Sequence, residues 1–467
     1  MAADMLKKRL GIQSGISPKM KEALLKWKKA YINESSWIKK DIESLELPAA
    51  ISSEIARLVT VESSITFTGG ARADFISDQL DYFRQEKKNI VEMACAIGGM
   101  YFKPYVNNGK VMIDYIYQDE AIPFRFDSEK RITGVIFPTF LIEDNKRYVR
   151  LEIHDYSDEK YTISNRCFVS KDMYLDGPTI GNLGNEIDIK KVKAWENIEP
   201  LIEVSGTDGP LFSYFRIPIA NNIDRKSPLG VSVFSRALKR IRKADIQASR
   251  LDWEFESKET AIELNESYLT QDIYGNAKLP QGKERMYRTY SGTGSFDDGK
   301  GLFLHFSPDI RDQSFINGLD KYLRDIEFTS GLAYGTLSNP QNVDKTAEEI
   351  KASKQRSYQL VKDIQNSLEK SLKDLIRCID ELATAYSLVP DGEYKVSFEW
   401  DDSIIVDASK EKQQDIQDIN TGVLNKYEYR MKWYGEDEQT AKEKIEEMNK
   451  SSGGINSLFG NRDYGDE

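Results

Sequence analysis

The sequence of 467 residues predicts an α+β protein built from several structural units. Three observations support this prediction. Apolar residues recur at helical spacing in the first hundred residues, alternate like strands from about Met100 to Pro218, and return to a long helical pattern from about Thr346 to Leu388. The chain is longer than one hydrophobic core usually accommodates, so we expect more than one unit.

The composition excludes several classes of protein. With 65 Lys+Arg against 76 Asp+Glu, the net charge of -11 argues against a chain that coats nucleic acid with its whole surface. Cys95, Cys167 and Cys378 are far apart, so neither a disulfide framework nor a zinc site is encoded and a reducing compartment is expected. The first residues lack the apolar core of a secretion signal, and residues 132–142 fall short of the ~20 apolar residues that span a bilayer. We therefore expect a soluble intracellular protein with no membrane partner.

The first hundred residues predict helices with recognisable starts and stops. Ser17 and Pro18 supply a cap and a first-turn proline for a basic amphipathic helix. The helical period returns in residues 47–62, and a later helix is expected to stop at Gly98 and Gly99. The apolar face of the first helix is formed by Leu24, Trp27 and Tyr31.

A mostly antiparallel β region follows, with a hairpin turn at Asn108-Gly109. Ser227 and Pro228 can then cap a helix of roughly 30 residues, about 45 Å long. Its predicted apolar side consists of Val231, Phe234, Leu238, Ile241, Ala248 and Phe255. The opposite side carries a basic stripe, Arg236, Lys239, Arg240, Lys243 and Arg250. Such a stripe is also the pattern of a solvated helix face.

The next segment predicts a compact β insert with a tight turn at Asp298-Gly299, and then a helix that stops at Gly331. The segment from Thr336 to Lys345 is rich in turn formers and too polar for a core. It leads into the most regular helix of the chain, from about Thr346 to Leu388 and roughly 60 Å long. The apolar positions of that helix are Val361, Ile364, Leu368, Leu372, Leu375, Ile379, Leu382 and Tyr386.

An acidic cluster follows the alternating strand EYKVSFEW, where Asp401, Asp402 and Asp407 lie close to Glu399. A two-metal site needs carboxylates from several strands, and adjacent residues such as Asp401 and Asp402 point to opposite faces of an extended chain. Asp407 stands where the N-cap of the next helix belongs. The pattern favours a hinge between a strand and short C-terminal helices, with a metal-dependent nuclease as the alternative from another class.

No other residue set indicates catalysis. His154 and His305 are the only histidines, and each lies in an alternating strand pattern without a nucleophile motif nearby, so partly buried structural roles are expected. The sequence has no GxxxxGK[ST] phosphate loop, no HExxH and no EF-hand loop. We therefore predict a non-enzymatic protein without a metal or cofactor.

Several segments in order resemble the portal proteins of tailed phages that infect Gram-positive bacteria. They are LLKWKKAYINESSW, SLELPAAISSEIARLVTVES, AIGGMYFKPYVNNGKVMIDYI, RLEIHDYSDEKYTISNR, IPIANNIDRKSPLGVSVFSRAL, and KTAEEIKAS followed by WDDSIIVD. The resemblance covers nearly the whole chain. It implies the portal fold, with an α/β wing, long stem helices, a small β-rich clip, a tunnel loop with a long helix, and a C-terminal helical crown.

The resemblance also implies where these parts lie. They are the N-terminal helices and wing (1–226), first stem helix (227–260), clip (261–311), second stem helix (312–333), tunnel loop (334–345), long helix with a returning wing strand (346–406), and a short crown with a mobile tail (407–467). The candidate DNA-channel residues of the tunnel loop are Gly335, Thr336, Ser338, Asn339, Gln341, Asn342 and Lys345. The candidate docking residues of the clip are Arg285, Arg288 and Lys300.

The implied function is a ring, usually of twelve subunits, at one capsid vertex. Double-stranded DNA would be packaged and ejected through it without sequence specificity. The clip would dock the large terminase ATPase and later the head-to-tail adaptor, with the major capsid and scaffolding proteins as further partners. The ring would assemble in the host bacterial cytoplasm and become part of the virion. A shorter type of ring-forming head-to-tail connector is the alternative among virion proteins.

The net charge of the chain indicates how DNA would move through such a channel. Twelve copies at -11 would carry about -130, a field that repels phosphate and keeps DNA mobile. The basic stripe on the stem would then either touch DNA or pair with acidic residues of a neighbouring subunit. We favour pairing between subunits, because a strongly attractive ring would oppose translocation.

Overall fold

The computed structural model describes residues 2–61, 63–157, 160–171, 183–258, 261–265, 287–290, 303–306, 309–339, 347–400 and 408–446. The chain divides into two compact units, Met1–Phe398 and Glu399–Glu467. Both helices and sheets are abundant, which confirms the mixed helix-and-sheet class. None of the helices in the described ranges is long and apolar enough to cross a bilayer.

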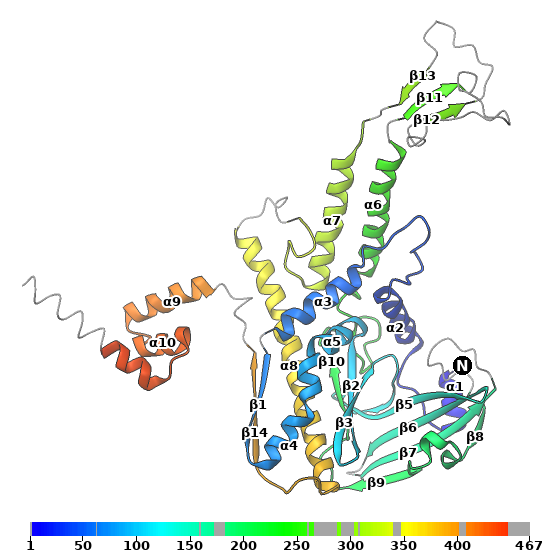
Figure 1. Ribbon diagram of the computed structural model, residues 1–467, viewed down its shortest axis with the longest axis vertical. Helices are drawn as coiled ribbons and strands as arrows, with labels where there is room; N and C mark the ends of the chain where they lie inside the picture. The colour runs from blue at the N-terminus through cyan, green and yellow to red at the C-terminus, as the bar shows by residue number, and fades with distance from the viewer. Residues whose placement is uncertain are drawn as a thin grey trace, which may run out of the picture. The chain divides into compact units, whose positions relative to one another are not determined.

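Five helices and one strand precede the β region (Figure 1). Helix α2 (Pro18–Tyr31) begins as predicted, because the Ser17 hydroxyl accepts a hydrogen bond from the Met20 amide at 3.3 Å. Its Trp27 is almost fully buried. The remaining elements of this region are α1 (Ala2–Leu10), α3 (Leu47–Thr60), β1 (Ser63–Gly69), α4 (Ala71–Gln79) and α5 (Asp81–Ile97).

Glycine ends α5 as predicted, since Gly98 has a φ of 103° in the left-handed region. Strand β2 (Gly99–Asn107) then reverses into β3 (Lys110–Tyr117). The turn residues Asn108 and Gly109 have φ values of 50° and 75°. Two successive positive φ values define the type I′ hairpin that an Asn-Gly pair favours, so the predicted hairpin is confirmed.

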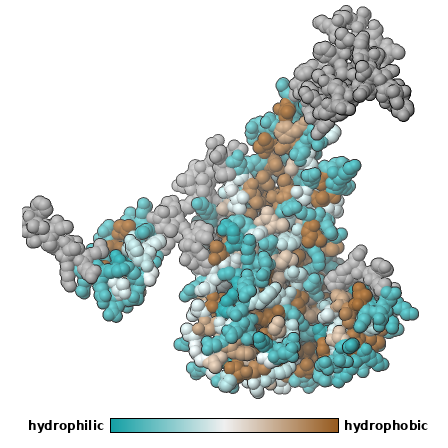
Figure 2. All heavy atoms as spheres, viewed as in Figure 1, coloured by the Kyte–Doolittle hydropathy of each residue, from teal (hydrophilic) through white to brown (hydrophobic). Residues whose placement is uncertain are grey.

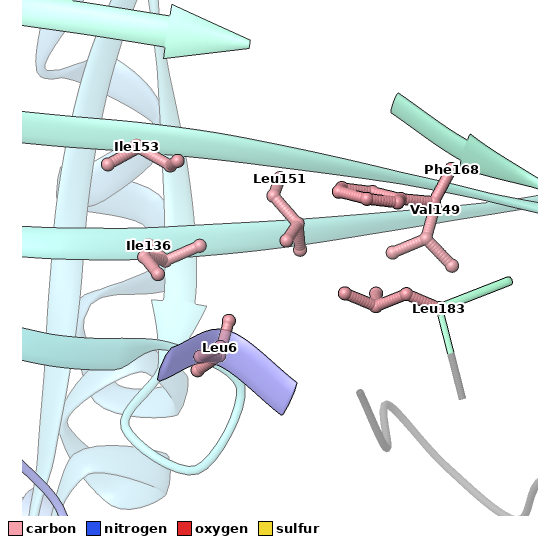
Figure 3. Close-up of a cluster of buried hydrophobic side chains, with 7 residues drawn as sticks. All are labelled: Leu6, Ile136, Val149, Leu151, Ile153, Phe168 and Leu183. Carbon is pink, nitrogen blue, oxygen red and sulfur yellow. The ribbon is translucent and has the colours of Figure 1, made fainter. Parts of the chain in front are cut away.

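The larger sheet is antiparallel, with the strand order β4-β5-β6-β7-β8 and with β9 also paired to β7. The strands are β4 (Ile122–Phe126), β5 (Ile132–Glu143), β6 (Lys146–Ser157), β7 (Lys160–Ser170), β8 (Asn185–Ile187) and β9 (Leu201–Ser205). One face carries a buried apolar cluster, in which Leu6 of α1 and Leu183 meet side chains of β5, β6 and β7 (Figure 3). Helix α1 is therefore held to the sheet by the burial of apolar side chains.

A smaller sheet of order β10-β2-β3 packs against helix α8 (Ala347–Ala385), where β10 spans Ser213–Arg216. The Ser213 hydroxyl donates to the Ser371 carbonyl oxygen at 2.6 Å. The predicted apolar positions of α8 from Val361 to Leu382 are buried, which confirms that periodicity. Tyr386 was wrongly included, because it lies beyond the helix and is 57% exposed.

Strand β14 (Tyr394–Trp400) returns after α8 and pairs with β1. Its alternating sequence predicts this strand correctly. Arg72 of α4 reinforces the junction: its Nε lies 2.6 Å from Asp380 Oδ1, and its Nη2 donates to the Thr384 hydroxyl at 2.5 Å. The guanidinium is almost fully buried between α4 and the end of α8.

The first stem helix begins later than predicted. Helix α6 spans Leu238–Ser257, 20 residues, and does not start at Ser227. The Ser227 hydroxyl accepts from the Leu229 amide two residues on, at 3.2 Å, which is a local turn and not a helix cap. Val231 and Phe234 are consequently buried ahead of the helix.

Close packing explains why residues 228–237 are not helical. A Cβ on Gly230 would lie 2.0 Å from the Gly98 carbonyl oxygen, so the two backbones touch. The Gly230 amide donates to Gln118 Oε1 at 3.1 Å, and the Val233 amide donates to the Cys95 carbonyl oxygen at 3.0 Å. These donors are satisfied by tertiary contacts and are not available to an α-helix.

Helix α7 (Asp312–Ser330) lies beside α6 and ends at Gly331, whose φ is 78° (Figure 1). The predicted glycine stop is therefore confirmed. Three strands occur within the predicted β insert, β11 (Ala261–Asn265), β12 (Tyr287–Tyr290) and β13 (Phe303–Phe306), in the order β12-β11-β13. The Asp298-Gly299 turn lies outside the described residues.

The second unit contains short helices joined at glycines, as predicted. Helices α9 (Ala408–Thr421) and α10 (Lys426–Tyr434) are followed by helical residues 438–446. Gly422 and Gly435 have φ values of 75° and 65°. The proposed cap Asp407 lies outside the described residues.

Candidate functional site

A buried carboxylate organises the segment that follows α7. Glu327 is fully buried, and its Oε1 accepts hydrogen bonds from the amides of Gly335 at 3.1 Å, Leu337 at 2.6 Å and Ser338 at 2.9 Å. Its Oε2 accepts from the Ser338 hydroxyl at 2.9 Å. One side chain thus satisfies four donors and fixes the chain as it leaves the helix.

Asp320 holds the next residue of this segment. Its Oδ1 accepts from the Asn339 amide at 2.9 Å, while its Oδ2 lies 2.6 Å from Arg324. Asp320 and Glu327 are seven residues apart, so they lie on one face of α7, two turns from each other. We call residues Gly335–Asn339 the loop base.

Helix α8 packs against the end of α7, just before the loop base. The Arg356 guanidinium lies 4.5 Å from the centre of the Phe328 ring and 5.9 Å from that of Tyr334. A Cβ on Gly331 would approach Leu360 Cδ2 to 2.8 Å, so α7 and α8 nearly touch at this turn. The loop base therefore begins at the point where α7 and α8 meet.

The expectation that this segment is too polar for a core is wrong at Ser338, which is 4% exposed. Its hydroxyl is bonded to Glu327, whereas Thr336 and Asn339 are exposed. Gln341, Asn342 and Lys345 lie outside the described residues. Sequence reasoning missed Asp320 and Glu327; their i, i+7 spacing immediately before a turn-rich segment was the available signal.

Helices α6 and α7 are joined by ionic and polar contacts. Glu254 of α6 is 5% exposed in its side chain, and its Oε2 lies 2.8 Å from Arg311 Nη2. Hydrogen bonds from Arg311 and Lys258 hold the pKa of Glu254 well below its usual range. Gln247 Nε2 donates to the Phe315 carbonyl oxygen at 3.3 Å.

The five basic residues predicted as one stripe have different surroundings. Arg240 and Lys243 face α7, where Arg240 Nε lies 3.7 Å from Asp325 Oδ2 and Lys243 Nζ lies 6.0 Å from the centre of the Tyr322 ring. Arg236 precedes α6 and donates to the Ala220 carbonyl oxygen at 3.2 Å. Lys239 and Arg250 are exposed on α6.

Hydrophobic side chains are also exposed along the two stem helices (Figure 2). Trp253 is 67% exposed and Phe328 is 54% exposed, with Phe255 and Ile316 also exposed. Apolar groups of this size on a helical pair are typical of a surface that contacts another chain.

The candidate clip and acidic residues are only partly described. Arg288 lies in β12, and Arg285 and Lys300 fall outside the described residues. The hypothetical metal ligands Asp401, Asp402 and Asp407 fall outside them too. Within the described ranges, no three His, Cys, Asp or Glu residues are grouped to hold a metal ion.

His154 occupies a buried structural position, as predicted. It is 2% exposed in β6, its Nε2 lies 2.8 Å from Glu152 Oε1, and its Nδ1 meets the Tyr161 hydroxyl. Burial lowers the pKa of His154. Burial alone would raise the pKa of Glu152, but His154, Lys103 and Arg150 hold it well below its usual range. His305 pairs with Ile262 in the small β11–β13 sheet.

These features describe a pair of packed helices, α6 and α7, followed by an anchored loop. Residues 69–454 match the family model described as "Phage portal protein, SPP1 Gp6-like". The chain therefore belongs to this family of phage portal proteins. At the level of the family, it is a structural component of a virion and not an enzyme.

Two further comparisons add little. No curated protein matched the chain. A solved structure titled "Neck of native GTA particle computed with C12 symmetry" is similar at 10% sequence identity, with 90% of this chain and 96% of that chain covered. Its TM-score is 0.43.

Proposed function

We propose that the protein forms a ring, of twelve subunits in the virion, at one capsid vertex of a tailed phage of Gram-positive bacteria. Double-stranded DNA is packaged and later ejected through its channel. Membership of the portal family supports this proposal. The observation that carries the channel assignment is the loop base anchored by buried Glu327.

A firmly bonded base is expected for a loop that contacts DNA while the DNA moves through the channel. The load on a loop that contacts DNA is transmitted to its base, where Glu327 and Asp320 supply five hydrogen bonds. Thr336 and Asn339 at the exposed part of the base are uncharged, as are Gln341 and Asn342 further on. Uncharged groups contact DNA without the salt-dependent attraction of Lys or Arg, so the DNA keeps moving.

The net charge supports a channel that repels DNA. At -11 for each subunit, a ring of twelve carries about -130. We propose that Lys239 and Arg250, exposed on α6, pair with a neighbouring subunit. Arg240 and Lys243 contribute chiefly to the contact between α6 and α7 of one chain.

The proposed partners follow from the same assignment. The β insert, with Arg285, Arg288 and Lys300, docks the large terminase ATPase during packaging and the head-to-tail adaptor afterwards. The C-terminal helices face the capsid interior as a crown, and the wing meets the major capsid and scaffolding proteins. Assembly takes place in the host cytoplasm before the ring becomes part of the virion.

Electron microscopy and native mass measurement of the purified full-length protein test the ring. We expect particles with a central hole and a mass that is a multiple of the 53.5 kDa chain. Isolated portals can assemble with a different subunit number from that in the virion, so the number is checked in virions. A monomer that cleaves DNA only with a divalent metal would contradict the proposal and favour the nuclease.

The loop is tested separately in virions. We expect a Thr336→Lys, Asn339→Lys variant to form normal rings but to package or eject DNA more slowly, because each subunit would add two charges that attract phosphate. The matched control is the uncharged Thr336→Gln, Asn339→Gln variant, which should behave like the natural protein. Equal DNA yields from the two variants would refute the channel role of this loop.

A further inference from the structure

The outer edge of strand β3 borders an open groove of about 910 Å³. Among the described strands, β3 pairs with β2 alone, so its other edge has no neighbouring strand. The opposite wall of the groove is formed by α4 and α5, which contribute Gln79, Tyr82 and Met93 among others.

The backbone of β3 offers hydrogen-bonding groups to this groove. The Val111 amide donates to Gln79 Oε1 at 3.2 Å, which shows that it points away from β2. In an antiparallel pair, every second residue directs its amide and its carbonyl oxygen to the same side of the strand. The amides and carbonyl oxygens of Ile113 and Tyr115 therefore also point to the open edge. Neither has a hydrogen bond across that edge within the described part of the chain. An extended chain could pair with this edge.

The side chains around the edge indicate which chain would fit. The groove is lined by four carboxylates and one ammonium group, from Lys110. Asp81 is paired with Arg84 at 2.7 Å and Asp114 with Lys103 at 3.3 Å, so Asp78 and Glu86 supply the negative charge that is available to a ligand. Apolar side chains are exposed between them, with Tyr82 61% exposed, Met112 47% and Tyr105 38%. An acidic rim around apolar surface is complementary to a strand that alternates apolar and basic residues.

We propose that this groove binds an extended segment of another protein, with alternating apolar and Lys or Arg side chains, that adds as a strand to the edge of β3. We infer that the segment comes from another protein, because the longer parts of this chain outside the described residues do not alternate apolar and basic residues over the length of a strand. These parts are residues 172–182, 266–286, 291–302 and 447–467. The surface is separate from the proposed channel, and its occupation does not require DNA.

The test uses the purified full-length protein and three labelled seven-residue peptides. One alternates Lys and Val, the second replaces each Lys with Glu, and the third is the Lys-Val peptide with N-methyl groups on the amides that would face β3. We expect the Lys-Val peptide to bind at least tenfold more tightly than either of the others in fluorescence anisotropy. Hydrogen exchange should slow at Ile113 and Tyr115 when it is bound.

Two variants assign the site. Asp78→Lys with Glu86→Lys should weaken binding of the Lys-Val peptide at least tenfold, whereas Glu143→Lys, at the exposed end of β5, should leave it unchanged. Ile113→Pro removes an amide that faces the groove and keeps the β2 ladder, so it should weaken binding without unfolding the protein.

Three results would overturn the proposal. Equal binding of the N-methylated peptide would mean that no strand is added, and equal binding of the Glu-Val peptide would remove the role of charge. Slow exchange at Ile113 and Tyr115 before any peptide is added would assign the edge to a second copy of this chain. Peptide binding does not depend on whether rings are seen by electron microscopy. The portal function and the peptide-binding groove are therefore tested independently of each other.

Discussion

Replacing Glu327 tests whether one buried carboxylate holds the loop base. In Glu327→Ala, the amides of Gly335, Leu337 and Ser338 and the Ser338 hydroxyl lose their acceptor. A hydrogen bond to a charged group contributes roughly 1.5–3 kcal/mol. The four bonds share one carboxylate and are not additive, so we expect a local loss of about 4 kcal/mol.

Hydrogen exchange measures this loss at the three amides themselves. About 4 kcal/mol corresponds to exchange roughly 10³-fold faster, or to the rate of an unprotected amide if that is reached first. Ser338→Ala removes one bond and should cost roughly 1.5–3 kcal/mol. Glu327→Gln keeps a carbonyl oxygen for the amides and should lie between the natural protein and Glu327→Ala.

The matched control is Asp325→Ala, two residues earlier on the same helix. The side chain of Asp325 is 50% exposed and reaches only Arg240, at 3.7 Å, so the loop amides should exchange as before. Exchange in Glu327→Ala within threefold of the natural protein would refute the reasoning. Equal acceleration in both variants would show that the effect is general destabilisation of α7.

The remaining predictions concern the wing. Gly230→Ala should lower the thermal unfolding temperature sharply, because its Cβ would lie 2.0 Å from the Gly98 carbonyl oxygen; an unchanged temperature would mean that the two backbones can separate at no cost. Arg72→Ala should cost at least about 3 kcal/mol in urea unfolding, because it leaves Asp380 and a backbone carbonyl without their partner, and a loss under about 1 kcal/mol would contradict this. Because burial lowers the pKa of His154 from 6.5, the folded state favours neutral imidazole. Stability should therefore be full above about pH 6.5 and fall as the pH drops from there toward the lowered pKa. His154→Asn should flatten this dependence below about pH 6.5 in thermal unfolding, and an unchanged slope would show that other groups cause it.

Much of the fold could be predicted because local signals agreed with the tertiary structure. The Ser17 cap, the Asn108-Gly109 turn and the Gly331 stop each act through a few neighbouring residues. The helical period of α8 could be predicted for a similar reason, since one face of this long helix is buried against the β10-β2-β3 sheet.

The bonds that fix the loop base could not be predicted from the sequence. Ser338 looks like a solvated loop residue until its partner is known, and the partner lies eleven residues away on α7. A local pattern of turn formers predicts a loop but says nothing of the buried acceptor that fixes it.

By itself, the sequence determined the elements whose hydrogen bonds and apolar faces are local, including the glycine stops, the hairpin and the long helix. Only the tertiary structure decided where α6 begins, because the amides of Gly230 and Val233 donate to Gln118 and to the end of α5. It also decided which polar residues are buried. Burial and pairing depend on groups that are distant in the chain, and no local periodicity encodes them.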